Sequence, residues 1–331
     1  MLFFDLKVND RIFLKEKKYI TMSGIVEELD KLKKERKAVI LAHVYQPPEI
    51  YDIADFVGDS LDLSRKAFQV EADIIVFCGV YFMAEIASIL NPKKKVLIPD
   101  INADCPMADM ITTEKLKEFK SQCKDPVVVA YVNTSAAVKA ESDICCTSSN
   151  AVDVVKSIKG DGEIIFVPDR NLGNYIQKKL GRGMKIWNGF CPTHNNFILP
   201  EYILKARKEH PHAEILVHPE CRPEVISLAD HIMSTGNMCR YVKRSAIKEF
   251  IIGTESGILY KLEKENPNKN FYLASSLAIC PNMKKITLAK VKDVLANMKN
   301  LISVPEAIRE RACYPVLKML KVTQNKTIFK K

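Results

Sequence analysis

Three short apolar runs in this chain of 331 residues end in side chains that can bind ligands or transfer protons. The residues at the ends of the runs are His43, Tyr131 and His218, and the residues two positions later are Tyr45, Asn133 and Glu220. Such runs are typical of buried parallel strands, in which positions two apart face the same side. Each strand is therefore expected to present two polar groups at its carboxyl end. Imidazole and carboxylate groups placed there can serve as general acids and bases.

The regular spacing of the three runs indicates an internal repeat. His43 and Tyr131 are 88 residues apart, and Tyr131 and His218 are 87 residues apart. Further matching positions carry Asp55, Asp143 and Asp230, and five residues later Ser60, Ser148 and Thr235. The hydroxyl residues fall where helices are expected to begin, so they could be N-caps. They could instead bind anions, because a helix N-terminus presents free N–H groups and a positive dipole end.

One cysteine recurs at a matching position of every repeat. Of the ten cysteines, Cys105, Cys191 and Cys280 lie 86 and 89 residues apart, and proline follows each of them. Ligands of open α/β sheets gather outside the carboxyl ends of the strands, so the three thiols are expected to converge. Three thiolates suit zinc or an iron–sulfur cluster, and a cubane would keep one iron open as a Lewis acid. The alternative is that all three are core cysteines inherited from one ancestral position.

The expected elements alternate between strands and amphipathic helices with a period of about 87 residues. We therefore predict an α/β fold of three homologous three-layer αβα domains, whose small parallel sheets surround a pseudo-threefold axis. The predicted repeats cover 38–125, 126–212 and 213–301, flanked by an N-terminal extension and helix at 1–37 and a C-terminal helix and tail at 302–331.

The composition narrows the class of protein. Hydrophobic residues make up 47% of the chain, enough for a substantial core, and no apolar run is long enough for a membrane span. No signal peptide is recognised, so a cytoplasmic protein with reduced cysteines is expected. The formal net charge is +10, which favours small anionic substrates. Neither an interleaved basic–aromatic patch nor a known module predicts nucleic-acid binding.

Several longer motifs follow one another along the chain. They are "ILAHVYQPPEIYDIADFVGDSLDLSRKA", "VFCGVYFMAEIASILNP", "AYVNTSAAVKAESDICCTSSNAV", "PDRNLGNYI", "HPECRPEV", "STGNM", "IGTESGILYKL" and "CPNMKK". Together they resemble the quinolinate synthase family, and the resemblance runs from about residue 24 to 318. It implies an enzyme of NAD biosynthesis that condenses iminoaspartate with dihydroxyacetone phosphate, yielding quinolinate, phosphate and water.

The resemblance also implies a cofactor and site residues. It places an oxygen-sensitive 4Fe-4S cluster on Cys105, Cys191 and Cys280. The implied catalytic residues are His43, Tyr45, Tyr131, His218 and Glu220, and the implied substrate-binding residues are His43, Ser60, Tyr131, Asn133, Ser148, His218, Glu220, Ser234 and Thr235. Besides the two small-molecule substrates, it implies a supplying partner, the aspartate-oxidising enzyme of the pathway.

A few positions depart from the family pattern. Asn commonly stands where this chain has Val44, Tyr81 replaces a His, and "GHCPVH" appears as "GFCPTH". None of these is an implied site residue, so activity is expected to survive. His194, three residues after Cys191, is either a neighbour of the site or a surface residue, and no role is assigned to the first 20 residues.

Two other functions remain open for the same residues. One is a zinc-dependent lyase that uses the three cysteines with an open coordination position. The other is a non-enzymatic iron–sulfur sensor, which would not need the histidines, tyrosines and glutamate. Metal content and the effect of substituting His43 or Glu220 would separate these functions.

Overall fold

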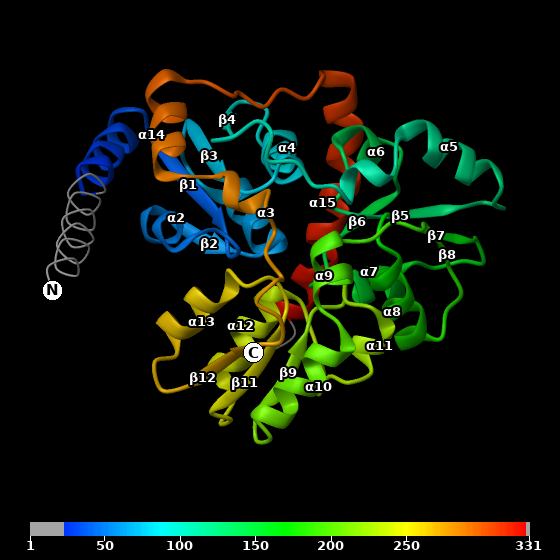
Figure 1. The fold of residues 1–331 in the computed structure, drawn as a ribbon. Coiled ribbons are helices and arrows are strands. Elements are labelled where there is room, and N and C mark those ends of the chain that lie inside the picture. The colour runs from blue at the N-terminus through cyan, green and yellow to red at the C-terminus, as the bar shows by residue number, and fades with distance from the viewer. Residues whose placement is uncertain (1–22, 329–331) are drawn as a thin grey trace, which may run out of the picture.

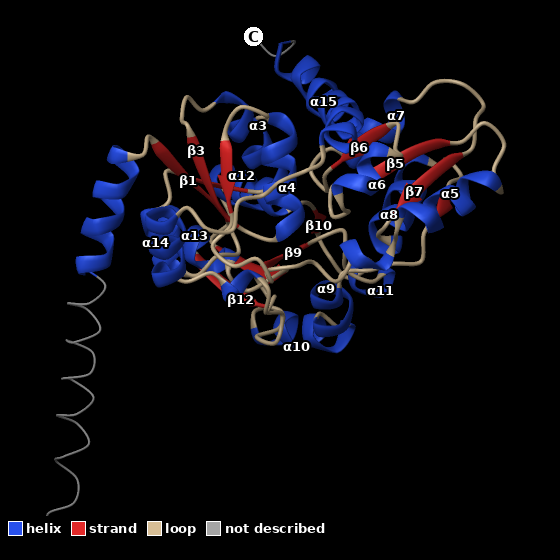
Figure 2. Cartoon of the chain, turned by 90° about the horizontal axis from the view of Figure 1, so that it is seen from above, coloured by secondary structure: helices blue, strands red, loops and turns tan. Residues whose placement is uncertain are grey.

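The computed structural model describes residues 23–328, and within them residues 23–35 form a helix that precedes the first strand (Figure 1). Residues 1–22 of the predicted N-terminal segment at 1–37, and residues 329–331 of the predicted C-terminal segment at 302–331, lie outside the described residues. The remainder forms three parallel four-stranded sheets that surround a common centre. Helices lie on both faces of the sheets (Figure 2), so the predicted three-layer α/β class is confirmed.

The first sheet has the strand order β2-β1-β3-β4. Its strands are β1 (Ala38–His43), β2 (Phe56–Gly58), β3 (Ile74–Cys78) and β4 (Lys95–Leu97). The helices in this stretch are α2 (Pro48–Ile53), α3 (Ser60–Gln69), α4 (Tyr81–Leu90), the short 3-10 helix η1 (Ala108–Met110) and α5 (Thr113–Ser121). Ile40, Leu41 and Ala42 are fully buried because helices cover both faces of the central strand.

The second sheet repeats this order as β6-β5-β7-β8. Its strands are β5 (Val127–Tyr131), β6 (Ile144–Cys146), β7 (Ile164–Val167) and β8 (Lys185–Ile186). The helices are α6 (Ala136–Ala140), α7 (Ala151–Ser157), α8 (Arg170–Leu180), α9 (Pro192–Phe197) and α10 (Pro200–Glu209).

The third sheet has the order β10-β9-β11-β12. Its strands are β9 (Glu214–Val217), β10 (His231–Ile232), β11 (Glu249–Gly253) and β12 (Asn270–Leu273). The helices are α11 (Pro223–Ile226), α12 (Thr235–Arg244), α13 (Ile258–Glu265), η2 (Met283–Lys285) and α14 (Leu288–Asn297), followed by the long C-terminal helix α15 (Glu306–Ile328).

The repeated aspartates hold the first strand of each sheet. Asp55, Asp143 and Asp230 accept hydrogen bonds of 2.7 to 2.8 Å from the backbone N–H groups of Ile40, Val128 and Ile215, near the amino ends of the strands. These aspartates therefore have a structural role far from the carboxyl ends.

The last helix of each repeat packs against an element of the next repeat (Figure 1). Helix α5 contacts α6, and its Phe119 ring lies 5.6 Å from Trp187. Helix α10 contacts β11, and α14 returns to β3. The three repeats are thus joined in a cycle. The repeat boundaries, each placed after a closing helix, stay a prediction. Helix α15 packs on α4, α6 and α7 and joins the first two repeats.

None of the helices in residues 23–328 has the length and apolar character needed to cross a membrane.

Candidate active site

A cavity of about 190 Å³ lies where the carboxyl ends of the three sheets meet. All three repeats contribute to its lining. The predicted residues in the lining are His43, Tyr45, Ser60, Cys105, Tyr131, Asn133, Ser148, Cys191, His218, Glu220, Thr235 and Cys280. Of the predicted site residues, only Ser234 is not part of the lining formed by the described residues. The repeat therefore brings its chemically active residues together in one cavity.

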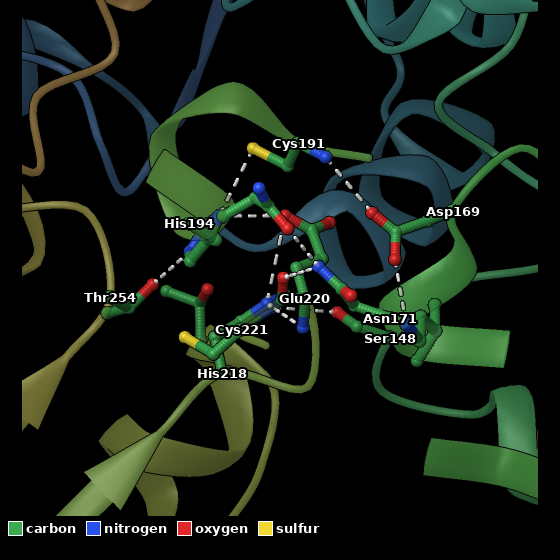
Figure 3. Close-up of polar contacts among 12 residues, drawn as sticks. Ser148, Asp169, Asn171, Cys191, His194, His218, Glu220, Cys221 and Thr254 are labelled. Atoms are coloured by element: carbon green, nitrogen blue, oxygen red, sulfur yellow. Dashed lines mark hydrogen bonds and ion pairs between the residues drawn. The ribbon is translucent and has the colours of Figure 1, made fainter. Parts of the chain in front are cut away.

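Glu220 lies at the centre of a buried network (Figure 3). Its Oε1 accepts a hydrogen bond of 2.5 Å from the Tyr131 hydroxyl, and its Oε2 lies 2.8 Å from Nδ1 of His194. His218 stacks on His194 with ring centroids 4.6 Å apart, and its Nε2 is 3.2 Å from the Ser148 hydroxyl. Tyr131 and His194 therefore contact the Glu220 carboxylate directly, while His218 lies 3.8 Å from it through Nδ1.

Burial determines the protonation of this network. It lowers the pKa of His43 to about 4 and that of His218 to about 3, so both imidazoles are neutral near pH 7. Burial alone would raise the pKa of Glu220, but His218, His194 and Tyr131 lower it overall, so the carboxylate is ionised. The pKa of Tyr131 is well above its usual value because of burial and the nearby Glu220.

Tyr45 closes the side of the cavity formed by the first repeat. Its backbone N–H donates to Nδ1 of His43 at 3.2 Å, and the two rings meet edge to face at 4.6 Å. The Tyr45 hydroxyl lies 2.7 Å from the Thr235 hydroxyl and 2.6 Å from the Thr254 hydroxyl. One phenol thus connects the first repeat to two elements of the third.

The hydroxyl residues of the repeat are not the N-caps of their helices. Asp59 caps α3 by accepting from Leu61 and Asp62 N–H groups, while Ser60 lines the cavity. Ser234 caps α12, and Thr235 faces the cavity as the first helical residue. The cap interpretation is therefore wrong for Ser60 and Thr235. Ser234 accepts a capping hydrogen bond from the Asn237 N–H, and its expected substrate binding stays a prediction.

The three repeat-related cysteines all reach the cavity. Burial raises the pKa of Cys105 to about 12, and burial also raises the pKa values of Cys191 and Cys280. Neutral thiols would be the stable form without a cation, and a bound metal would release their protons. The donor set is soft and sulfur-rich, so it fits an iron–sulfur cluster held by three cysteines.

A second set of possible ligands overlaps the first. Donor atoms of Cys191, His194 and Glu220 lie within 4.8 Å of one another, close enough for a single ion. A metal site at this place is therefore supported by the residues, and both sets share Cys191.

Several residues of the site were not predicted from the sequence. His194 is buried, lies 3.2 Å from the Cys191 sulfur and 2.8 Å from the Thr254 hydroxyl, and so belongs to the site and not to the surface. Asp59 and Glu255 also line the cavity. The sequence feature that could have identified Asp59 is its position directly before Ser60. Outside the cavity, His210 stacks on Tyr272, and the His231 ring lies tilted against the Tyr241 ring with ring centroids 4.6 Å apart.

This chain is similar to known proteins over most of its length. The family described as "Quinolinate synthetase A protein" matches residues 27–321. Proteins named quinolinate synthase from Desulforudis audaxviator and Dehalococcoides mccartyi strain 195 are each 55% identical, over 89% and 90% of this chain and 97% and 98% of their own lengths. A "Quinolinate synthase 1" from Methanosarcina acetivorans is 51% identical over 91% of this chain and 98% of its own. With nearly the full described length matched, this chain belongs to the quinolinate synthetase A family of enzymes.

Proposed function

We propose that this chain is a quinolinate synthase, which condenses iminoaspartate with dihydroxyacetone phosphate and releases phosphate and water in NAD biosynthesis. The observation that carries the proposal is the meeting of three repeat-related cysteines with the Glu220 network in one cavity. Family membership supports the same reaction. An aspartate-oxidising enzyme would supply the iminoaspartate.

The cavity has groups suited to the carboxylates and the phosphate of these substrates. The ten-residue helices α3 and α12 begin at the cavity, and Ser60 and Thr235 are their first residues. Free N–H groups and hydroxyls at helix N-termini stabilise anions. The buried Oδ1 of Asn133 has no hydrogen-bond partner among the described residues, so the Asn133 amide is available to a ligand.

His43 and His218 are the proposed bases, because both are neutral and buried in the cavity lining. A proton taken from the carbon acid would make an imidazolium, which could then give that proton to the leaving hydroxyl so that it departs as water. Glu220, 3.8 Å from Nδ1 of His218, would stabilise that cation. Tyr131 orients Glu220, and Tyr45 orients the substrate beside His43.

The cysteines would hold the cofactor. Cys105, Cys191 and Cys280 are the proposed ligands of a 4Fe-4S cluster, which when bound supplies an open iron as a Lewis acid. The alternative cofactor is a single zinc ion on Cys191, His194 and Glu220, favoured by the short distances among their donor atoms. Metal content distinguishes the two.

The direct test is formation of quinolinate from iminoaspartate and dihydroxyacetone phosphate by protein purified without oxygen. The wild type is expected to form quinolinate. Glu220→Gln removes the charge that would stabilise the His218 imidazolium, so it is expected to reduce kcat by about 10²-fold or more, within the range of about 10²- to 10⁴-fold that acid–base catalysis contributes. Exposed Glu224 on α11 provides a matched Glu224→Gln control. An iron-loaded wild type that forms no quinolinate would refute the proposed function.

A further inference from the structure

A backbone hydrogen bond recurs beside each of the three cysteines. A residue at or just before the start of the helix that follows the third strand of each sheet donates its N–H to the carbonyl of the residue two positions before the cysteine. The pairs are Tyr81 with Ala103, Arg170 with Gly189, and Ser256 with Ala278, each at 2.8 Å. Every cysteine loop is therefore tied to a helix of its own repeat by the same contact.

A buried carboxylate adds a second tie in the second repeat (Figure 3). Asp169 Oδ2 accepts a hydrogen bond of 3.2 Å from the backbone N–H of Cys191. Its Oδ1 accepts one of 2.7 Å from Leu172 at the start of α8. One side chain thus joins the cysteine backbone to the helix N-terminus.

The third repeat has the same arrangement with a longer side chain. Glu255 Oε1 accepts a hydrogen bond of 3.0 Å from the Cys280 N–H, and Oε2 accepts one of 2.7 Å from Gly257, directly before α13. Lys284 Nζ lies 2.9 Å from Oε1 and also donates to the carbonyl of Tyr45. The carboxylate that holds Cys280 is therefore connected to the loop of Tyr45.

Strand register shows that the two carboxylates are equivalent. Val167 pairs with Ala130 and Gly253 pairs with Val217, so Asp169 and Glu255 each lie two residues past matching positions. In the first repeat Cys78 pairs with Ala42, and the corresponding residue is Val80, which has no acceptor. Asp169 and Glu255 are both 0% exposed. Burying a carboxyl group costs free energy unless hydrogen bonds or a charged partner compensate for the lost water contacts.

We propose that Asp169 and Glu255 are positioning residues, which fix the backbones of Cys191 and Cys280 for metal binding. The inference rests on the proposed function, because it takes these cysteines as cluster ligands. Each carboxyl group uses both oxygens as acceptors, one for the cysteine and one for the helix start. An amide of the same shape has one acceptor and would leave one N–H group unpaired. Residues that orient metal ligands typically change metal affinity 10- to 100-fold when replaced.

The test measures how fast the protein releases iron to an excess of chelator without oxygen. The loss of cluster absorbance reports this release. Asp169→Asn and Glu255→Gln are compared with the wild type. Asp143→Asn is the matched control, because Asp143 also accepts from a backbone N–H but at the opposite end of its sheet. Circular dichroism of the protein after iron release shows whether each variant is folded.

Faster iron release from folded Asp169→Asn and Glu255→Gln, by about tenfold or more, is the expected result, with Asp143→Asn unchanged. If one variant does not fold, the other decides the question. Release from both at the wild-type rate would overturn the positioning role and leave the proposed function intact. A wild type that contains no iron would overturn both.

Discussion

The hydroxyl of Tyr131, at the end of β5, donates a 2.5 Å hydrogen bond to Glu220, which lies beyond the end of β9. This contact joins the second repeat to the third inside the cavity. It also sets the direction in which Glu220 faces His194 and His218, because it engages one carboxylate oxygen and leaves Oε2 to the histidines.

Tyr131→Phe is therefore expected to lower kcat by about 10- to 100-fold, since a hydrogen bond to a charged group is worth about 1.5–3 kcal/mol. Steady-state kinetics of quinolinate formation measure the effect. Tyr175→Phe is the control, because the Tyr175 hydroxyl contacts Lys179 on a helix outside the cavity. An unchanged kcat in Tyr131→Phe would show that Glu220 does not need this donor.

Acidification is expected to destabilise the protein partly through His43. Burial, opposed by Asp59 and Glu220 and assisted by Lys284, lowers the pKa of His43 to about 4 in the folded state. Because the unfolded state binds its proton near pH 6.5, the stability present above that pH is lost as the pH falls towards 4. From pH 7.5 to pH 5 the loss from this residue is about 2 kcal/mol.

Urea unfolding of wild type and His43→Asn at both pH values measures this contribution. Asn keeps an acceptor for the Tyr45 N–H but does not titrate. The variant should lose about 2 kcal/mol less on acidification, and exposed His212→Asn should behave as the wild type. Equal pH dependence of wild type and His43→Asn would disprove the assignment.

Lys284 is expected to stabilise the buried Glu255. Lys284→Met removes its cation and should lower the free energy of unfolding by about 3–5 kcal/mol, the usual effect of leaving a buried charge unpaired. Adding Glu255→Gln to that variant should recover part of the loss, because the unpaired charge is then gone. Chemical unfolding of the two single variants and the double variant tests the pair. A double variant less stable than Lys284→Met would contradict this account.

Gly257 provides a test of the close packing around Tyr45. A Cβ atom at this position would lie 2.6 Å from the Tyr45 carbonyl oxygen and 2.7 Å from Lys284 Nζ. Gly257→Ala should therefore destabilise the protein by about 1–3 kcal/mol, as overpacking usually does. Gly183→Ala is the control, since a Cβ atom there meets nothing within 4 Å. Similar unfolding midpoints for the two variants would argue against this packing.

The convergence of the candidate site residues in one cavity could be predicted from the sequence, because every repeat presents them at the same register position of a parallel strand. His43, Tyr131 and His218 meet because their strands end at one centre. His194 could not be assigned, because its spacing from Cys191 is equally compatible with the exposed face of a short helix. Its burial depends on Thr254 and Glu220 of another repeat.

The elements against which the closing helices pack likewise could not be predicted from the sequence. An amphipathic pattern shows that α5, α10 and α14 each bury one face, but it does not show against which sheet. The contact of α14 with β3 joins the last repeat to the first, about 200 residues away along the chain. Such a closure follows from the arrangement of all three sheets together.

The central claim is that three repeat-related cysteines hold one cluster, and metal analysis tests it most directly. Iron and sulfide are measured in protein purified without oxygen, for the wild type, Cys105→Ala, Cys191→Ala and Cys280→Ala, with half-buried Cys313→Ala as the control. The account predicts about four irons per chain in the wild type and control, the content of a 4Fe-4S cluster, and their loss in the three variants. Zinc in the wild type, or full iron content in any of the three variants, would contradict it.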